Sequence, residues 1–206
     1  LNGFFKTLEL VQYEYIVIAC ILIIASVWIR AIRWNFLFKK DDGVDNYSLF
    51  QYELIGYFGN NVLPLRLGEI LRAYMVGKHF NIPKSYAFGT IVLERILDSF
   101  ALFFISILLL IIYPITDTVK NYIYIGMLIS LILVIGLFLL KKNHITNDKS
   151  FILSVVNSFL NGFKNIEFKK IPILFFLSIA TWMIYWLNVH LIQMAFGFEM
   201  SKYHSL

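Results

Sequence analysis

Long uncharged stretches alternate with short charged ones along this chain, and this pattern predicts membrane-spanning helices. Four stretches contain no Asp, Glu, Lys or Arg: 15–29, 99–116, 121–140 and 171–198. A helix of about 20 apolar residues crosses about 30 Å of hydrocarbon, and long side chains at its ends can reach the interface. We therefore predict an all-α fold, a polytopic integral membrane bundle with spans at about 13–34, 85–113, 121–140 and 171–197.

One further apolar stretch does not have the composition of a lipid-exposed span. Residues 48–65 are apolar enough for bilayer depth, yet they are interrupted by Glu53, Gly56, Gly59, Asn60, Asn61 and Pro64. Irregular backbone at that depth is tolerated only where protein buries it or where it lines a wet cavity. We predict a broken or re-entrant helix at 48–65, with an interfacial amphipathic helix as the alternative.

Composition supports the membrane assignment. The chain has 206 residues, of which 59% are hydrophobic and only 15% are charged, whereas soluble domains carry about a quarter charged residues. This excludes a disordered tail and an ordinary soluble enzyme. The single Cys, Cys20, rules out an intramolecular disulfide. The length leaves little room beyond one membrane domain, 1–206.

The basic residues are distributed unevenly between the two predicted sides of the membrane. The segments 30–98 and 141–170 carry 15 Lys and Arg, while the opposite side carries 3. The positive-inside rule therefore predicts that these segments, including a basic loop at 141–170, face the cytoplasm of a prokaryotic cell. The formal net charge of +5 is then explained by the orientation of the chain in the membrane. We therefore expect no nucleic-acid binding.

Charged residues of both signs gather between 66 and 98, where charge is costly. If 66–72 is helical, Arg66, Glu69 and Arg72 form a ladder on one face. Glu94 and Asp98 also share a helix face, and two neighbouring carboxylates repel unless a cation, a proton or an arginine lies between them. Ionisable residues near a span favour a functional site. The alternative is a salt-bridge network that only fixes helix register.

Two arginines of the first predicted span also have two possible roles. Arg30 and Arg33 are three residues apart near its end. They can belong to the charged site, but we favour anchoring at the lipid headgroups.

Three motifs resemble a known family. They are 29–34 (IRAIRW), 59–69 (GNNVLPLRLGE) followed by Arg72, and 94–98 (ERILD). In order and spacing they resemble the flippase-like family named after the transmembrane region of lysylphosphatidylglycerol synthase. The resemblance implies a polytopic fold and, from fused bacterial members, movement of an aminoacylated phospholipid between leaflets. Family members usually have further spans, so we expect the chain to be incomplete. No soluble transferase domain is present here, which argues against synthase activity.

Our leading hypothesis is a lipid-translocation module rather than an enzyme. Arginine suits bidentate contacts to phosphate, and the acidic residues would balance the arginines when no lipid is bound. We expect an anionic or aminoacylated headgroup in a cytoplasm-facing cavity lined by Asn60, Asn61, Arg66, Glu69, Arg72, Glu94, Arg95 and Asp98. We assign no catalytic residue, metal or cofactor. Expected partners are membrane lipids, either phospholipid or polyprenyl phosphate, with a homo-oligomer or a transferase partner also open.

Two alternatives remain. In the first, the chain is a membrane-embedded transferase or transferase subunit acting on such a lipid, with Glu94 or Asp98 as general base or divalent-metal ligand. It lacks a nucleotide-binding or donor-binding motif. In the second, the chain is a scaffold that binds another membrane protein through its Phe-rich surface.

Overall fold

The computed structural model confirms an all-α membrane protein. It describes residues 11–112, 116–142, 151–164 and 168–197. Within these ranges the chain forms helices and no strand. The helices are α2 (Tyr13–Asn35), α3 (Asn46–Val62), α4 (Gly68–His79), α5 (Lys84–Ile112), α6 (Asp117–Lys142), α7 (Phe151–Lys164) and α8 (Ile171–Ala195).

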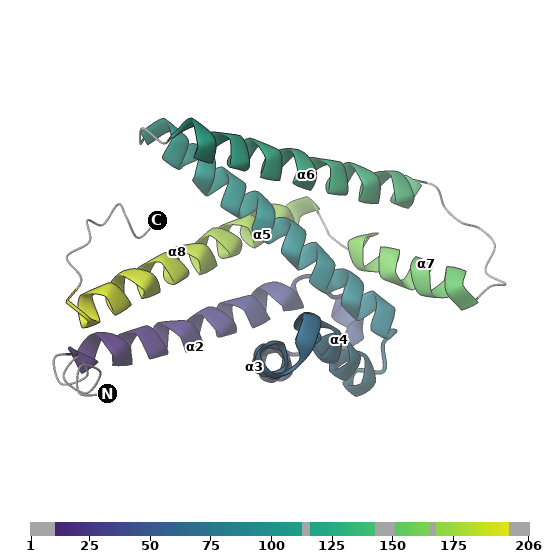
Figure 1. Cartoon of the computed structure of the whole chain (residues 1–206). Helices are drawn as coiled ribbons and strands as arrows, with labels where there is room; N and C mark the ends of the chain where they lie inside the picture. Colours follow the sequence, from purple (N-terminus) through teal and green to yellow (C-terminus); the bar gives the residue numbers. More distant parts are fainter. Residues whose placement is uncertain (1–10, 113–115, 143–150, 165–167, 198–206) are drawn as a thin grey trace.

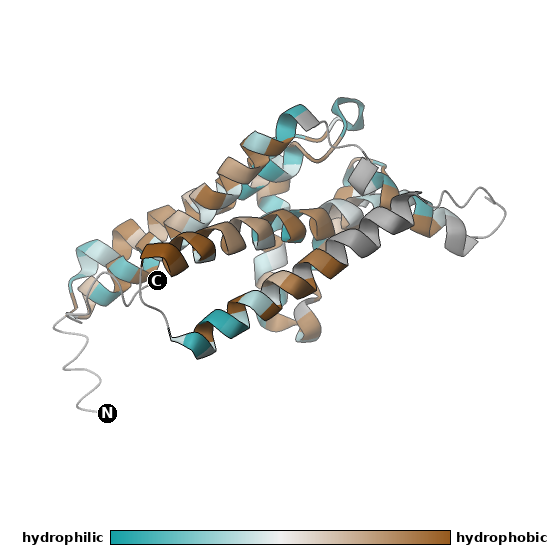
Figure 2. Ribbon diagram, turned by 90° about the horizontal axis from the view of Figure 1, so that it is seen from above, coloured by the Kyte–Doolittle hydropathy of each residue, from teal (hydrophilic) through white to brown (hydrophobic). Residues whose placement is uncertain are grey.

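Three of the described helices, α2, α5 and α8, are long and apolar enough to cross a membrane. The expected fourth span, 121–140, lies within α6. Helices α2 and α8 run antiparallel side by side, and the Gln12 N–H donates to the Ala195 carbonyl at 3.0 Å. Helix α5 crosses this pair obliquely (Figure 1). Figure 2 shows hydrophobic positions predominating along the long helices, as a lipid-facing bundle requires.

Helices α3 and α4 form a hairpin. It contains the 48–65 segment, which is one continuous helix as far as Val62, and the choice between a re-entrant and an interfacial position stays a prediction. Asp45 caps α3 by accepting a hydrogen bond from the Ser48 N–H at 2.8 Å. Helix α3 ends at Val62, and Leu65 takes a left-handed conformation with φ 58° that reverses the chain. Gly68 then begins α4 against α3, so closely that a Cβ there would overlap the Gly56 carbonyl oxygen. The chain thus turns back after α3.

The hairpin crosses the spans steeply. Helix α3 is seen nearly end-on in Figure 1, whereas α2 and α8 run across the view. The buried apolar core lies where the hairpin meets the end of α2, the start of α5 and α8; it includes Trp34, Leu49, Val76, Ile91 and Leu174. This core holds the hairpin against the spans.

The segment expected as a basic loop, 141–170, is largely helical where the structure describes it. Helix α6 continues to Lys142 and α7 follows at Phe151–Lys164, while 143–150 and 165–167 lie outside the described residues. Helix α7 packs closely on α5, because Gly162 lies against the backbone of Gly89 and Thr90. The basic residues therefore flank a packed helix rather than a plain loop.

Candidate functional site

Eight charged side chains from four helices meet where the hairpin, α2 and α5 come together. We call this set the charged cluster: Arg30, Arg33, Glu53, Glu69, Arg72, Glu94, Arg95 and Asp98. Six of its members are buried, and only Glu69 and Arg95 are not. Four arginines face four carboxylates, so the cluster is neutral as a whole. Balanced charge is a requirement for burial at low dielectric.

Glu94 is the centre of the charged cluster. Its side chain is fully buried. Arg30 and Arg33 approach Oε1 at 2.9 and 2.7 Å, and Arg72 approaches Oε2 at 2.6 Å. The carboxylate therefore joins α2, α4 and α5 at one point. Such charge-assisted bonds are short and strong.

Arg33 occupies the position between the two carboxylates of α5. Its guanidinium donates to Glu94, to both oxygens of Asp98 and, at 2.6 Å, to the Ser178 hydroxyl of α8. The predicted repulsion between Glu94 and Asp98 is thus relieved by an arginine from another helix.

Glu53 attaches the hairpin to the charged cluster. It is buried on α3, pairs with Arg72 of α4, and lies 3.7 Å from Nε of Arg30. Two carboxylates, those of Glu53 and Glu94, pair with the Arg72 guanidinium. Arg72 therefore stays charged, and it also lies over the Trp34 ring at 4.5 Å.

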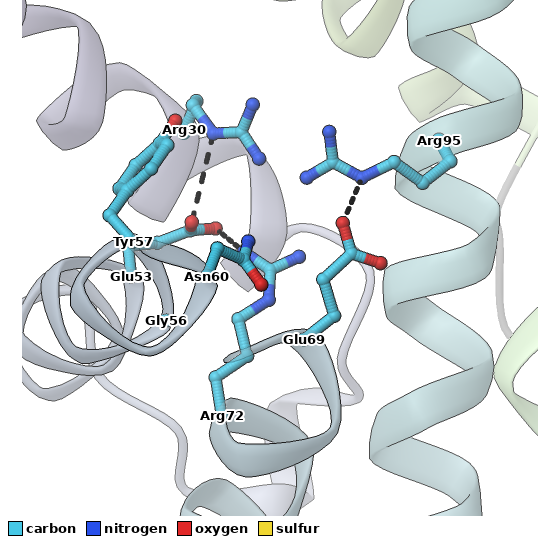
Figure 3. A pocket seen from close by; sticks show the side chains of 8 residues that line it. All are labelled: Arg30, Glu53, Gly56, Tyr57, Asn60, Glu69, Arg72 and Arg95. Carbon is cyan, nitrogen blue, oxygen red and sulfur yellow. Dashed lines mark ion pairs between the residues drawn. The ribbon is translucent and has the colours of Figure 1, made fainter. Parts of the chain in front are cut away.

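A small cavity lies inside the charged cluster. Figure 3 shows its lining: Arg30, Glu53, Gly56, Tyr57, Asn60, Glu69, Arg72 and Arg95. Its volume is about 20 Å³, which suits about one water molecule. Asn60 Oδ1 and the Nε atoms of Arg30 and Arg72 are buried without a hydrogen-bond partner among the described residues. In this conformation the cavity is too small for a lipid phosphate.

Arg95 and Glu69 form the exposed rim of the charged cluster. The Arg95 side chain is 40% exposed and the Glu69 side chain 28%, and Nε of Arg95 lies 3.3 Å from Oε1 of Glu69. Arg95 is also 3.8 Å from Glu94 and 3.6 Å from Asp98. These contacts are longer than those that hold Arg30, Arg33 and Arg72 to Glu94. Arg95 is the arginine of the cluster that an outside anion can reach most easily.

A second, larger cavity lies on the other side of Arg95. Its volume is about 250 Å³, and it is lined by Arg30, Arg95, Asp98, Ser99, Leu102, Thr181, Trp182 and Tyr185. Arg30 and Arg95 border both cavities. Tyr57 of the small cavity and Tyr185 of the larger one share a hydrogen bond of 3.2 Å between their hydroxyls. This tyrosine pair and the two arginines separate the cavities.

Most of the predicted site residues come together. Glu69, Arg72, Glu94, Arg95 and Asp98 belong to the charged cluster, and Asn60 lines the small cavity. The Asn61 side chain instead donates to the Tyr57 carbonyl of its own helix and is exposed. The Arg66 side chain lies outside the described part of the structure. Glu69 pairs with Arg95 of α5, and Arg72 pairs with Glu53 of α3 and Glu94 of α5. The Arg66 part of the predicted ladder lies outside the described side chains.

The expectation that Arg30 and Arg33 anchor at the headgroups is wrong. Both are buried and pair with the carboxylates of α3 and α5. The physical reason is that Glu94 and Asp98 need more positive charge than Arg95 alone supplies.

Glu53 was not predicted as a site residue, although a signal was available. Glu53, Gly56 and Asn60 recur at helical spacing within 48–65 and therefore share one face of α3. A carboxylate next to a glycine on an otherwise apolar helix indicates a close approach by a charged partner, here Arg72.

Comparison with known proteins places the chain in a family. The family described as the lysylphosphatidylglycerol synthase TM region matches residues 1–206. The chain belongs to this family. The resemblance carried by the three motifs is therefore confirmed, and the family indicates a lipid-related function in the membrane.

Curated relatives are archaeal membrane proteins. Two are UPF0104 membrane proteins of Methanocaldococcus jannaschii, 27% and 29% identical over 98% and 70% of this chain. These matches cover 68% and 64% of the two relatives. A UPF0104 membrane protein of Methanothermobacter thermautotrophicus is 26% identical over 91% of this chain and 64% of its own length. The chain spans about two thirds of these relatives, and no solved structure matches it.

Proposed function

We propose that this chain is a lipid-translocation module that binds the anionic or aminoacylated headgroup of a membrane lipid at the charged cluster. One observation carries the proposal: Arg95 is half exposed, is held only by long contacts, and borders the cavity of about 250 Å³. Family membership supports a lipid-related role. We also infer that the basic ends of the helices face the cytoplasm.

A phosphate can replace the carboxylate partners of Arg95. The guanidinium offers a planar fork that matches two phosphate oxygens, and such bidentate pairs are stronger than single contacts. Its present partners lie at 3.3 to 3.8 Å, longer than an ideal charge-assisted bond. Binding therefore breaks weak pairs and forms stronger ones. Glu69, once released, is available to a cationic group such as an aminoacyl ammonium.

The buried part of the charged cluster suits a closed state. With no headgroup bound, its arginines and carboxylates neutralise one another, which limits the penalty of holding charge at membrane depth. Translocation then requires the hairpin to move relative to α5 and α8. The Tyr57–Tyr185 hydrogen bond would break during this movement, since it links α3 of the hairpin to α8.

An exchange of charges at the rim separates lipid binding from folding. The double variant Glu69→Arg with Arg95→Glu keeps an ion pair between two half-exposed side chains and keeps the cluster neutral. Because the new carboxylate lies near Glu94 and Asp98, the melting temperature of the variant is measured together with its leaflet exchange. The variant places a carboxylate where the phosphate would bind. We expect reconstituted vesicles carrying a fluorescent lipid to lose at least 90% of the headgroup exchange between leaflets that the native chain supports.

The matched control exchanges another ion pair at a distance from the site. Asp117→Lys with Lys120→Asp reverses the exposed pair at the start of α6, where Nζ lies 3.0 Å from Oδ1. It should leave exchange unchanged. Native exchange rates in the Glu69→Arg, Arg95→Glu protein would refute the proposed function. Covalent modification of labelled lipid by the purified native chain would instead support the transferase alternative.

A further inference from the structure

An apolar cavity adjoins the cavity beside Arg95 along α5 and α8. This apolar cavity has a volume of about 280 Å³ and is lined by Leu102, Ile105, Ser106, Leu109, Trp182, Met183, Tyr185, Trp186 and Val189. It shares Leu102, Trp182 and Tyr185 with the cavity of about 250 Å³. Together they form what we call the α5–α8 groove, polar at one end and apolar at the other.

One face of each helix supplies the lining. On α5 the lining positions 95, 98, 99, 102, 105, 106 and 109 recur every three or four residues, as do 181, 182, 185, 186 and 189 on α8, where Met183 lies at the edge. Along α5 this face changes from charged residues to aliphatic ones. From Arg95 to Leu109 the helix rises about 21 Å, compared with about 15 Å for half of the hydrocarbon core.

The polar end suits an anion rather than a cation. Arg30 and Arg95 line it together with Asp98, so the lining has two guanidinium groups and one carboxylate, although the charged cluster as a whole is neutral. The Ser99 and Thr181 hydroxyl protons are directed to carbonyls of their own helices, those of Arg95 and Leu177. Two arginines of the charged cluster can therefore donate to a phosphate at this point, with Arg95 the more accessible of the two.

The apolar end suits one hydrocarbon chain. Its lining is aliphatic and aromatic apart from Ser106, and its volume is below the roughly 300 Å³ minimum of pockets that enclose a whole drug-sized ligand. Met183 and Val189 at its edge are exposed, so a chain can enter sideways from the bilayer. Trp186 lines this end as well, and its ring adds apolar contact area for a hydrocarbon chain.

We propose that the α5–α8 groove holds one hydrocarbon chain of a phosphate-bearing lipid, whose phosphate lies at the polar end beside Arg95. The second chain of a two-chain lipid stays in the bilayer. This inference rests on the proposed function for the nature of the substrate and adds where and how it binds. Recognition then depends on the phosphate and on a single chain, and a wide range of headgroups is compatible with it.

Photoaffinity labelling of the full chain tests the groove. The probe is phosphatidylglycerol with a photoactivatable diazirine on one acyl chain, added to purified protein in detergent, and the labelled residues are located by mass spectrometry. We expect labels to concentrate on groove residues of α5 and α8. Unlabelled phosphatidylglycerol should reduce labelling about 10-fold, and diacylglycerol with the same chains, which lacks the phosphate, should reduce it much less.

Two neighbouring substitutions provide a matched comparison. Leu109→Trp fills the groove, whereas Leu108→Trp adds the same side chain one residue away, at an exposed position that does not line it. Labelling of α5 and α8 should fall about 10-fold in the first variant and stay unchanged in the second. If Leu109→Trp fails to fold, Leu109→Phe narrows the same cavity with a smaller added volume.

Several outcomes would overturn the groove. They are labels spread evenly over the lipid-facing helices, equal labelling of the two Trp variants, or equal competition by diacylglycerol. Labelling can fail in one of these ways while the Glu69→Arg, Arg95→Glu variant still loses the movement of lipid between leaflets. In that case the groove is not the site of the hydrocarbon chain, and the proposed function stands. If the groove is labelled as expected but the native chain supports no leaflet exchange, the lipid binds there and translocation is refuted.

Discussion

Arg33 of α2 binds Asp98 of α5 through both terminal nitrogens of its guanidinium, and Nη2 lies 3.1 Å from Oδ2. The same guanidinium donates to Glu94 and Ser178, so one fully buried side chain connects α2, α5 and α8. Without Arg33, Asp98 would have only Arg95 at 3.6 Å and Arg30 at 4.0 Å as cationic partners in a low-dielectric environment. The stability of the bundle should therefore depend on Arg33 more than on any exposed ion pair.

Removing Arg33 tests this dependence. Arg33→Met keeps an unbranched side chain but leaves Asp98 and Glu94 with too little positive charge, which should cost about 3–5 kcal/mol of unfolding free energy. Adding Asp98→Asn to it should recover at least half of that loss, because the variant then buries one negative charge fewer. Thermal unfolding in detergent measures both effects. Lys120→Met, which breaks an exposed pair with Asp117, should cost less than about 1 kcal/mol; equal losses for Arg33 and Lys120 would contradict the prediction.

Gly68 should tolerate no side chain. A Cβ at this position would overlap the Gly56 carbonyl oxygen and lie 2.7 Å from the Asn60 backbone nitrogen, so α3 and α4 would have to separate. We expect Gly68→Ala to destabilise the protein by about 3 kcal/mol or more, at the upper end for overpacking. Gly126→Ala is the control, because its Cβ would meet only the Phe103 ring at 3.4 Å. A normal melting temperature for Gly68→Ala would show that the hairpin is not packed as described.

Acid should weaken the start of the hairpin through Asp45. The Ser48 N–H donates to its carboxylate and lowers the Asp45 pKa below the usual value. Since the folded pKa is depressed, the cap stabilises α3 fully above the unfolded pKa and is lost as the pH falls through the folded one. Asp45→Ala should cost about 1 kcal/mol at neutral pH and less in acid. Asp45→Asn keeps a cap that does not titrate. In this variant the protection of the first turn of α3 against hydrogen exchange should not fall in acid, as it does in the native chain. The same loss of protection in both proteins would rule out Asp45 as the cause.

The tyrosine pair that links α3 to α8 should control movement of the hairpin. Tyr185→Phe removes the 3.2 Å hydrogen bond to Tyr57, a net loss of about 1 kcal/mol. If this bond breaks during translocation, leaflet exchange should become several-fold faster while the melting temperature falls slightly. Tyr57→Phe should have the same effect, and the double variant should add nothing further. Slower or unchanged exchange in both single variants would exclude this role for the pair.

Hydropathy predicted the helical frame well, because burial in lipid requires every spanning backbone to be helical. The span predicted at 13–34 is Tyr13–Asn35, and that predicted at 171–197 is Ile171–Ala195. The hairpin was indicated by glycines and a proline at membrane depth. Its turn falls at Leu63–Leu65, after the Gly59-Asn60-Asn61 segment, which stays helical. Local sequence shows that the chain must break, but tertiary packing of Gly68 on Gly56 decides where.

The charged cluster was predicted only in part, because partners far apart in sequence leave no local pattern. Glu94, Asp98 and Arg95 lie within one helix, and their pairing could be anticipated from spacing. Arg30 and Arg33 fit an interfacial anchor equally well until α5 is placed beside them. Glu53 finds its partner Arg72 only when the hairpin closes. The prediction that these residues bind a lipid headgroup remains to be tested by the experiments above.

The pairing of Arg33 with Glu94, 61 positions later, has a consequence for how the protein is made. At about 5–20 residues per second, a ribosome exposes the arginines of α2 several seconds before the carboxylates of α5. During that interval α2 carries two uncompensated charges that oppose its settling in the bilayer. Stable insertion of α2 should therefore wait for α5, and a chain truncated before Glu94 should leave α2 accessible to water-soluble thiol reagents at Cys20, whereas the longer chain protects it.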